Sequence, residues 1–239
     1  MAVRVLLTGT ADQVGRLAPG LREAGMEPVE CPLLETVPVG DGPIAIEGFD
    51  WLVLTSRAAV EYLFARLSGP LPRVAAIGPG TAEALRARGV EPGLVAEVFT
   101  QEGLVAAFPR PPGRVLFLGA EGARDVLASE LGAERRTLYR TVERVPDELP
   151  AVELAVLASG SAARALARTG GPATPCVSIG PVTTAVARKL GLVVVAEAAT
   201  SDLDGLIEAV RLAGSKLSPS LPRTGSPVSE IPAHPSSPS

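Results

Sequence analysis

Short runs of glycine, serine and threonine recur in this chain, each directly after an apolar segment and directly before a segment with helical spacing. A helix that begins in this way leaves backbone N–H groups without intrahelical partners, and its dipole adds positive potential there. Carboxylates and phosphates bind at such helix ends. Six junctions of this kind are present, at residues 8–10, 55–57, 78–81, 119–122, 159–161 and 180–184.

The same residue types also have a purely structural explanation. Serine and threonine are preferred helix N-caps in any protein, so one junction alone is better explained as a cap. In open parallel sheets, however, these junctions gather at the carboxyl edge, where one small polyanion would meet several of them. None of the six has the glycine spacing of a dinucleotide-binding turn or of a phosphate loop, so nucleotide binding is not expected.

Two tyrosines are present. Tyr62 falls in an amphipathic helical segment beside Leu63 and Phe64, where a packing role is expected. Tyr139 falls in an extended, partly polar segment, 138–142, from which its phenol could face a ligand and donate a proton or a hydrogen bond. A packing role for Tyr139 is equally open at this point.

Histidine and cysteine are too scarce for several common kinds of site. The single histidine, His234, lies in a proline-rich C-terminal segment, and the two cysteines, Cys31 and Cys176, are far apart in sequence. This count excludes Ser-His-Asp and Cys-His catalysis in the folded body and a zinc finger site, so no metal ligands are predicted. Two isolated cysteines also suit a reducing cytoplasm better than a disulfide scaffold, and a cytoplasmic protein is expected.

The charge and the apolar content of the chain limit the classes of partner that it could bind. The formal net charge is −4 and only 3% of residues are aromatic, which argues against binding nucleic acid through phosphate contacts or base stacking. No apolar run approaches the roughly 20 residues of a membrane span, and residues 1–7 show no signal-peptide pattern.

The body of the chain alternates between predicted strands and helices. Residues 3–7, 51–54 and 74–77 are short aliphatic runs typical of buried strands, and helical spacing follows at 12–24 and 58–67. Strand, short turn and helix in repetition predict an α/β fold with parallel sheets.

An internal repeat divides the body in two. The segment IGPGT at 77–81 resembles IGPVT at 179–183, and WLVLTS at 51–56 resembles LAVLAS at 154–159. Two similar α/β units are therefore expected, with the ligand site in the cleft between them. The extended segment 33–38 and its counterpart 138–142 interrupt the alternation, and we interpret both as connectors rather than buried strands.

The C-terminal segment has a different composition. Residues 214–239 hold eight serines and six prolines in 26 positions and almost no apolar periodicity. Such a segment buries too little surface to offset the entropy of ordering it, so a disordered tail that includes His234 is predicted.

Six segments in order resemble the uroporphyrinogen-III synthase family: LTS at 54–56, IGPGTA at 77–82, LYRTV at 138–142, LASGS at 157–161, IGPVT at 179–183 and ATSD at 199–202. The resemblance covers roughly residues 3–211. It implies two similar parallel-sheet α/β domains, 1–34 plus 143–213 and 39–137, with a cleft between them. The chain would cross between these domains by a two-stranded antiparallel ladder, 35–38 and 138–142.

The resemblance also implies a reaction. Hydroxymethylbilane would lose water, its ring D would be inverted, and the macrocycle would close to uroporphyrinogen III without any metal or organic cofactor. Separately, we expect a monomer. Tyr139 matches the family's tyrosine that assists departure of the hydroxyl group. The residues expected to bind the carboxylate-rich substrate are Thr8, Gly9, Ser56, Arg57, Gly78, Thr81, Ser159, Ser161, Gly180 and Thr183.

Two other functions stay open on the sequence alone. A non-catalytic sensor of a tetrapyrrole-like ligand could use the same fold, although no appended DNA-binding helices are evident. A different two-domain enzyme, such as a nucleotide-sugar transferase, is disfavoured because no phosphate loop or acidic metal motif is found.

Overall fold

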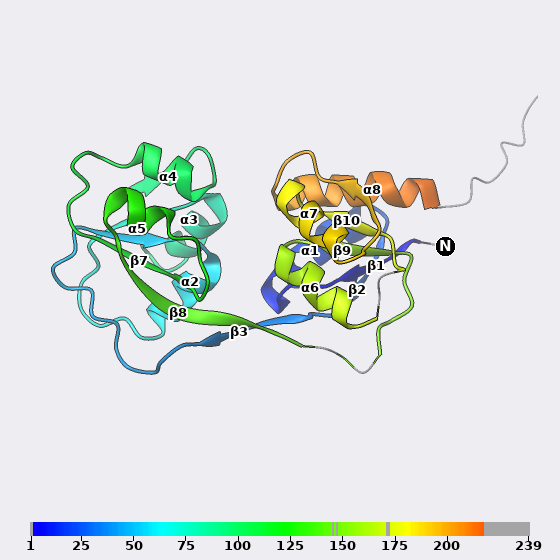
Figure 1. Ribbon diagram of the computed structural model, residues 1–239, viewed down its shortest axis with the longest axis horizontal. Helices are drawn as coiled ribbons and strands as arrows, with labels where there is room; N and C mark the ends of the chain where they lie inside the picture. The colour runs from blue at the N-terminus through cyan, green and yellow to red at the C-terminus, as the bar shows by residue number, and fades with distance from the viewer. Residues whose placement is uncertain (1, 145, 147, 171–172, 218–239) are drawn as a thin grey trace, which may run out of the picture.

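The computed structural model describes residues 2–144, 146, 148–170 and 173–217 (Figure 1). It contains two β-sheets, each covered by helices, and most strand neighbours within them are parallel. The predicted α/β class with parallel sheets is therefore confirmed.

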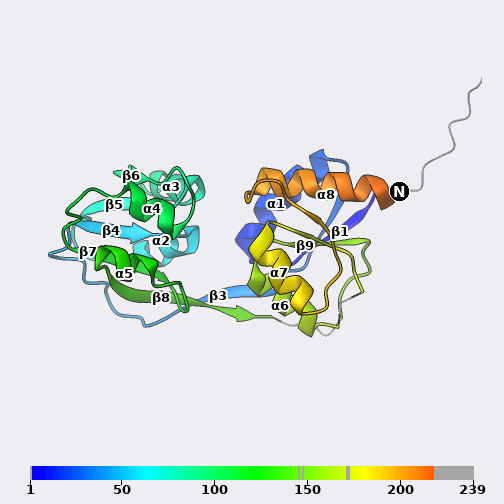
Figure 2. The same cartoon turned by 45° about the horizontal axis from the view of Figure 1, so that its top comes forward.

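The five-stranded sheet has the order β11-β10-β9-β1-β2, and its neighbouring strands pair in parallel. Its strands are β1 (Arg4–Leu7), β2 (Glu27–Glu30), β9 (Leu154–Leu157), β10 (Cys176–Ser178) and β11 (Val194–Glu197). Figure 2 shows α1 (Ala11–Glu23) and α8 (Leu203–Leu217) on one side of this sheet, and α6 (Gly160–Arg168) and α7 (Pro181–Lys189) on the other.

The aliphatic runs become strands buried on both faces because alternate side chains enter separate cores. In β1, Val5 and Leu7 belong to the core beneath α1 and α8, whereas Leu6 belongs to the core beneath α6 and α7. The same alternation divides β4, where Leu54 faces one core and Val53 the other.

The six-stranded sheet has the order β3-β8-β7-β4-β5-β6. Its strands are β3 (Leu34–Pro38), β4 (Trp51–Leu54), β5 (Arg73–Ala76), β6 (Leu94–Val95), β7 (Val115–Ala120) and β8 (Glu134–Glu143). One face packs against α2 (Arg57–Phe64) and α3 (Pro79–Arg86), and the other against α4 (Gln101–Ala107) and α5 (Val126–Leu131).

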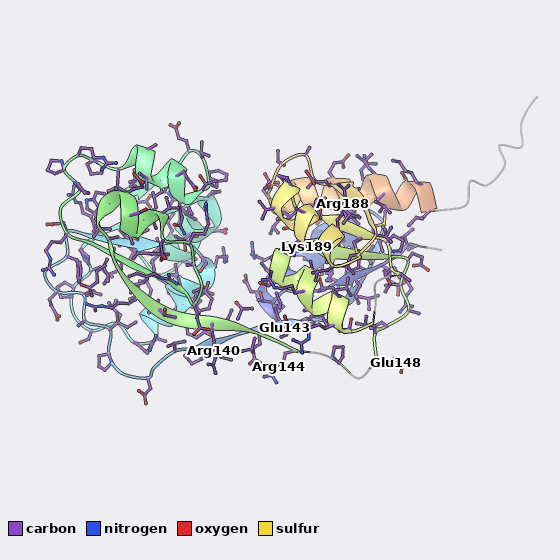
Figure 3. The ribbon with its side chains drawn as sticks, in the orientation of Figure 1. Arg140, Glu143, Arg144, Glu148, Arg188 and Lys189 are labelled. Carbon is purple, nitrogen blue, oxygen red and sulfur yellow. The ribbon has the colours of Figure 1, made fainter. Side chains whose placement is uncertain are left out.

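The chain passes from the five-stranded to the six-stranded sheet between β2 and β3, and returns between β8 and β9 (Figure 1). Residues of β3 pair in antiparallel register with the second half of β8, from Leu34 opposite Glu143 to Pro38 opposite Tyr139. Figure 3 places Glu143 and Arg144 where β8 leaves the six-stranded sheet, and both form ion pairs, with Arg168 and Glu35 respectively.

Segments 33–38 and 138–142 were expected to be connectors rather than buried strands, and for 138–142 the second part of this expectation was wrong. The strand β8 begins earlier, at Glu134, because its first half pairs in parallel with β7, and both Leu138 and Tyr139 are buried in the core. Tyr139 therefore sits on a strand that is fixed on both edges, by β7 and by β3.

Two further expectations need correction. The junction at 119–122 is not a helix start, because Gly119 belongs to β7 and α5 begins only at Val126. The predicted tail begins too early, since α8 continues to Leu217 and buries Ala213 and Gly214. The remainder of that segment, 218–239 with His234, lies outside the described residues.

Candidate functional site

A cavity of about 1040 Å³ lies at the carboxyl ends of strands from both sheets. Its wall includes the residues that follow β1, β4, β5 and β9, in the regions of Thr10, Ser56, Gly78 and Ser159. These are the junctions at which strands lead into α1, α2, α3 and α6. The cavity is thus built mainly from helix starts, as expected for a ligand site in parallel α/β sheets.

Seven of the eleven predicted site residues line this cavity. They are Ser56, Arg57, Gly78, Thr81, Tyr139, Ser159 and Ser161. They come from elements that adjoin both sheets. Ser56 and Ser161, more than a hundred positions apart in sequence, therefore line the same cavity.

The other four predicted residues do not line the cavity. Thr8 is buried, and its hydroxyl donates to the Val156 carbonyl at 2.6 Å, so it joins β1 to β9; Gly9, the next residue, is also absent from the wall. Thr183 is buried in α7. Gly180 is covered by Ser201, whose hydroxyl would lie 2.5 Å from a Cβ at that position.

The helix starts differ in how many of their N–H groups remain available. Ser56 and Ser159 cap α2 and α6, accepting from the N–H of Ala59 at 3.0 Å and of Ala162 at 3.1 Å. No side chain caps α3, which begins at Pro79. The amide groups in the first turns of these helices, together with the helix dipoles, favour a negatively charged ligand.

Charged side chains in the wall do not supply an excess of positive charge. They comprise two arginines, Arg16 and Arg57, and four carboxylates, Asp12, Glu35, Glu61 and Asp202. The Arg57 guanidinium lies 2.7 Å from the Glu83 carboxylate and 3.9 Å from Asp12. Arg57 is therefore already paired, and the helix starts provide most of the positive potential toward the cavity.

Tyr139 presents a phenol to the cavity from the strand β8. The ring is buried, and its oxygen lies 2.8 Å from the hydroxyl oxygen of Ser56, where either group can donate. Burial raises the pKa of the Tyr139 phenol above 10.0, although the hydrogen bond to Ser56 opposes this shift. The phenol is consequently protonated at neutral pH and is available as a hydrogen-bond or proton donor.

Two aromatic residues in the wall were missed from the sequence. Tyr62 was expected only to pack, yet it lines the cavity and stacks on Tyr139. Phe99 lies at the wall with 55% of its surface exposed. A signal for Tyr62 exists in α2, because Ala58, Glu61, Tyr62 and Ala65 have helical spacing and form one cavity-facing stripe.

The cysteines contribute no nucleophile to the cavity. Neither Cys31 nor Cys176 lines it, and burial raises the pKa of the Cys176 thiol to about 12. Across the part of the chain that the structure describes, no cluster of three or more histidine, cysteine or acidic side chains could hold a metal ion. Within the same residues, none of the helices has the length and apolar character needed to span a bilayer.

Known proteins resemble this chain over most of its length. The family model described as "Uroporphyrinogen-III synthase HemD" matches residues 15–208. A uroporphyrinogen-III synthase of Synechococcus elongatus is 31% identical over 165 residues, which cover 61% of this chain and 62% of that protein. A putative uroporphyrinogen-III synthase of Methanocaldococcus jannaschii is 25% identical over 151 residues, covering 59% and 63%. The chain spans less than two thirds of these relatives.

Solved structures share the fold. The uroporphyrinogen-III synthetase of Helicobacter pylori superposes with a TM-score of 0.60 at 17% identity, covering 90% of this chain and all of that one. A mutant uroporphyrinogen III synthase from Thermus thermophilus superposes with a TM-score of 0.55 at 18% identity and the same coverage. Because the family model matches residues 15–208, this chain belongs to the uroporphyrinogen-III synthase family.

Proposed function

We propose that this chain is a uroporphyrinogen-III synthase, which converts hydroxymethylbilane to uroporphyrinogen III with loss of water and inversion of ring D. The observation that carries the proposal is the convergence of helix starts from both sheets on one cavity that also holds a protonated, buried phenol. Such a site binds a polyanion and offers one proton donor, which is what this reaction needs. No metal or organic cofactor has a part in the proposal.

The substrate carries eight carboxylates, and the cavity offers them amides and hydroxyls. Thr81, Ser159 and Ser161 provide hydroxyls in the wall beside the first-turn amides of α3 and α6. Arg57 would contribute only if a substrate carboxylate displaced Glu83 from its guanidinium. Backbone N–H groups are suited to this task because they are oriented before the substrate arrives.

Tyr139 has the position and protonation state for the departure of the hydroxyl group. The C–O bond of the hydroxymethyl group breaks with its electron pair on oxygen, and the phenol donates the proton that completes the water molecule. The proton released when the ring closes restores the phenol. Ser56 holds the phenol oxygen in place through its hydrogen bond of 2.8 Å.

Geometry is the larger part of the catalysis that we propose. Hydroxymethylbilane left alone closes to the unrotated isomer, so the protein must hold both ends of a flexible chain in the arrangement that inverts ring D. A cavity of about 1040 Å³ lined by binding groups from both sheets provides orientation, which lowers the entropic part of the barrier.

The same proposal includes two domains, residues 1–34 plus 143–213 and residues 39–137, joined by the ladder at 35–38 and 138–142. Support comes from the two sheets, each of which has its own core on both faces. We further propose that the enzyme acts as a monomer in the cytoplasm, which light scattering during size-exclusion chromatography and cell fractionation would test.

The decisive experiment supplies hydroxymethylbilane, generated enzymatically in the same vessel, and identifies the uroporphyrinogen isomer by chromatography after oxidation. An excess of isomer III over the protein-free control supports the proposal. Isomer I alone contradicts it and favours the sensor or the unrelated two-domain enzyme, which binding assays with a linear tetrapyrrole and with nucleotide sugars would then separate.

A further inference from the structure

The two tyrosines of the chain meet in the cavity, although 77 positions separate them. Tyr62 comes from the helix α2 and Tyr139 from the strand β8. Their ring centroids lie 5.4 Å apart with an interplanar angle of 19°, which is a stacked arrangement. One face of the Tyr139 ring is thereby covered by the other tyrosine.

The Tyr62 ring is itself fixed at its outer end. Its hydroxyl donates to the Thr36 carbonyl at 2.6 Å and lies 3.1 Å from the Thr36 hydroxyl oxygen. Thr36 belongs to β3, the strand that pairs with β8. Tyr62 therefore connects α2, β3 and β8 at the point where the phenol of Tyr139 enters the cavity.

The surroundings of Tyr139 leave it little freedom. Ser56, the N-cap of α2, holds its oxygen, and Tyr62, six residues further along the chain, covers its ring. A hydrogen bond alone fixes one atom and allows the ring to tilt, whereas a stacked neighbour also fixes its plane. Both restraints come from α2 and its N-cap, so one rigid element fixes the plane of the Tyr139 ring and the place of its oxygen.

We propose that Tyr62 is a positioning residue that orients the Tyr139 phenol for proton donation to the leaving hydroxyl group. This inference rests on the proposed function, because it assigns Tyr62 a part in the same reaction. It needs no contact between Tyr62 and the reacting atoms. Its effect is to keep the Tyr139 oxygen within the narrow range of positions that a proton transfer requires.

The kinetic test compares Tyr62→Leu, which removes the stacked ring, with Tyr62→Phe, which keeps the ring and loses only the bond to Thr36. We expect Tyr62→Leu to lower kcat for isomer III by about 10-fold with KM within about twofold, and Tyr62→Phe to recover most of the rate. The matched control is Phe64→Leu, an aromatic residue of the same helix outside the cavity wall, which should leave kcat unchanged.

A second measurement separates positioning from the reaction itself. Because the chain has two tyrosines, ultraviolet titration of either Tyr62 variant reports the ionisation of Tyr139 alone. The titration midpoint should be lower in Tyr62→Leu than in Tyr62→Phe, since loss of the ring exposes the phenol to water. Melting curves confirm that both variants are folded at the assay temperature.

The outcomes distinguish the inference from the function on which it rests. Isomer I alone from the unmodified chain overturns the proposed function, and the titration still decides whether Tyr62 shields Tyr139. Isomer III from the unmodified chain with an unchanged kcat in Tyr62→Leu overturns the positioning role. Equal titration midpoints in the two Tyr62 variants overturn it as well.

Discussion

Ser56 and Ser159 occupy matching places in the two halves of the molecule, yet only one of them meets a phenol. Each follows a central strand, β4 or β9, and each caps the next helix with nearly the same geometry, at 3.0 and 3.1 Å. Ser56 alone has Tyr139 within hydrogen-bond distance. The cap explains why both halves have serine, and the mechanism that we propose assigns the proton donor to the six-stranded half.

The two similar segments IGPGT at 77–81 and IGPVT at 179–183 also differ in what lies against them. Phe99 lies against Gly78, where a Cβ would be 3.2 Å from its ring, whereas Ser201 lies against Gly180. Gly78 lines the cavity and Gly180 does not. The six-stranded half therefore supplies the aromatic residues of the wall (Tyr62, Phe99 and Tyr139), whereas both halves supply hydroxyls, amides and charges.

Replacing the phenol should remove the largest part of this difference. We expect Tyr139→Phe to lower the rate of isomer III formation by about 10-fold or more, because the general acid is lost while the ring remains. The measurement is the initial rate with enzymatically supplied hydroxymethylbilane, corrected for spontaneous closure. Turnover equal to that of the unmodified chain would remove Tyr139 from the mechanism.

The paired serines sharpen the comparison further. Ser56→Ala and Ser159→Ala each lose an N-cap, so each should lower the free energy of unfolding by about 1 kcal/mol. Their kinetics should differ. Loss of a hydrogen bond worth about 1 kcal/mol to Tyr139 should reduce kcat about fivefold in Ser56→Ala, whereas Ser159→Ala should raise KM and preserve kcat. Equal effects on kcat would mean that the two halves are not specialised.

The difference between the two halves could not be predicted from the sequence, because it depends on packing between elements. The aliphatic runs and the helix starts are local features, so the α/β class and most elements could be predicted from them. The seven wall residues were predicted from the helix starts together with the family resemblance, which supplied the role of Tyr139. The stacking of Tyr62 on Tyr139 depends on how α2 packs against β8, which no local pattern specifies. An amphipathic helix with a tyrosine indicates burial and does not indicate what covers the ring.

The four predicted residues outside the wall illustrate the same limit. Thr8 and Thr183 have the right type at the right kind of junction, but neighbouring elements bury both of them. Thr8 joins β1 to β9, and the segment containing Ser201 covers Gly180. The tail predicted from composition also begins four residues too early. The helix α8 continues to Leu217, and its Gly214 packs against Met26.

Phe99 offers a test of the aromatic wall that does not involve the phenol. Its ring is half exposed, so a bound pyrrole ring could bury part of it. Burial of roughly 30 Å² of apolar surface is worth about 0.7 kcal/mol, and Phe99→Ala should accordingly raise KM about threefold with kcat preserved. Val98→Ala is the matched control, since Val98 is exposed but absent from the wall. A KM unaffected by loss of Phe99 would limit the aromatic wall to the two tyrosines.

The smallest expected effect concerns the pH dependence of the rate of isomer III formation. This rate should stay constant at pH values where an exposed phenol would begin to ionise. The pKa of Tyr139 lies above its ordinary 10.0 because the ring is buried, so the protonated form required for donation persists to about pH 10.

The stability of the fold should depend on pH for the same reason. The unfolded chain ionises first as the pH rises, so the stability that burial of the neutral phenol contributes is present below pH 10 and lost as the pH passes through the folded pKa. Melting temperatures measured from pH 8 to 11 should consequently fall less in Tyr139→Phe than in the unmodified chain. An alkaline decline in rate centred below pH 10 that disappears in Tyr139→Phe would contradict the raised pKa of the phenol.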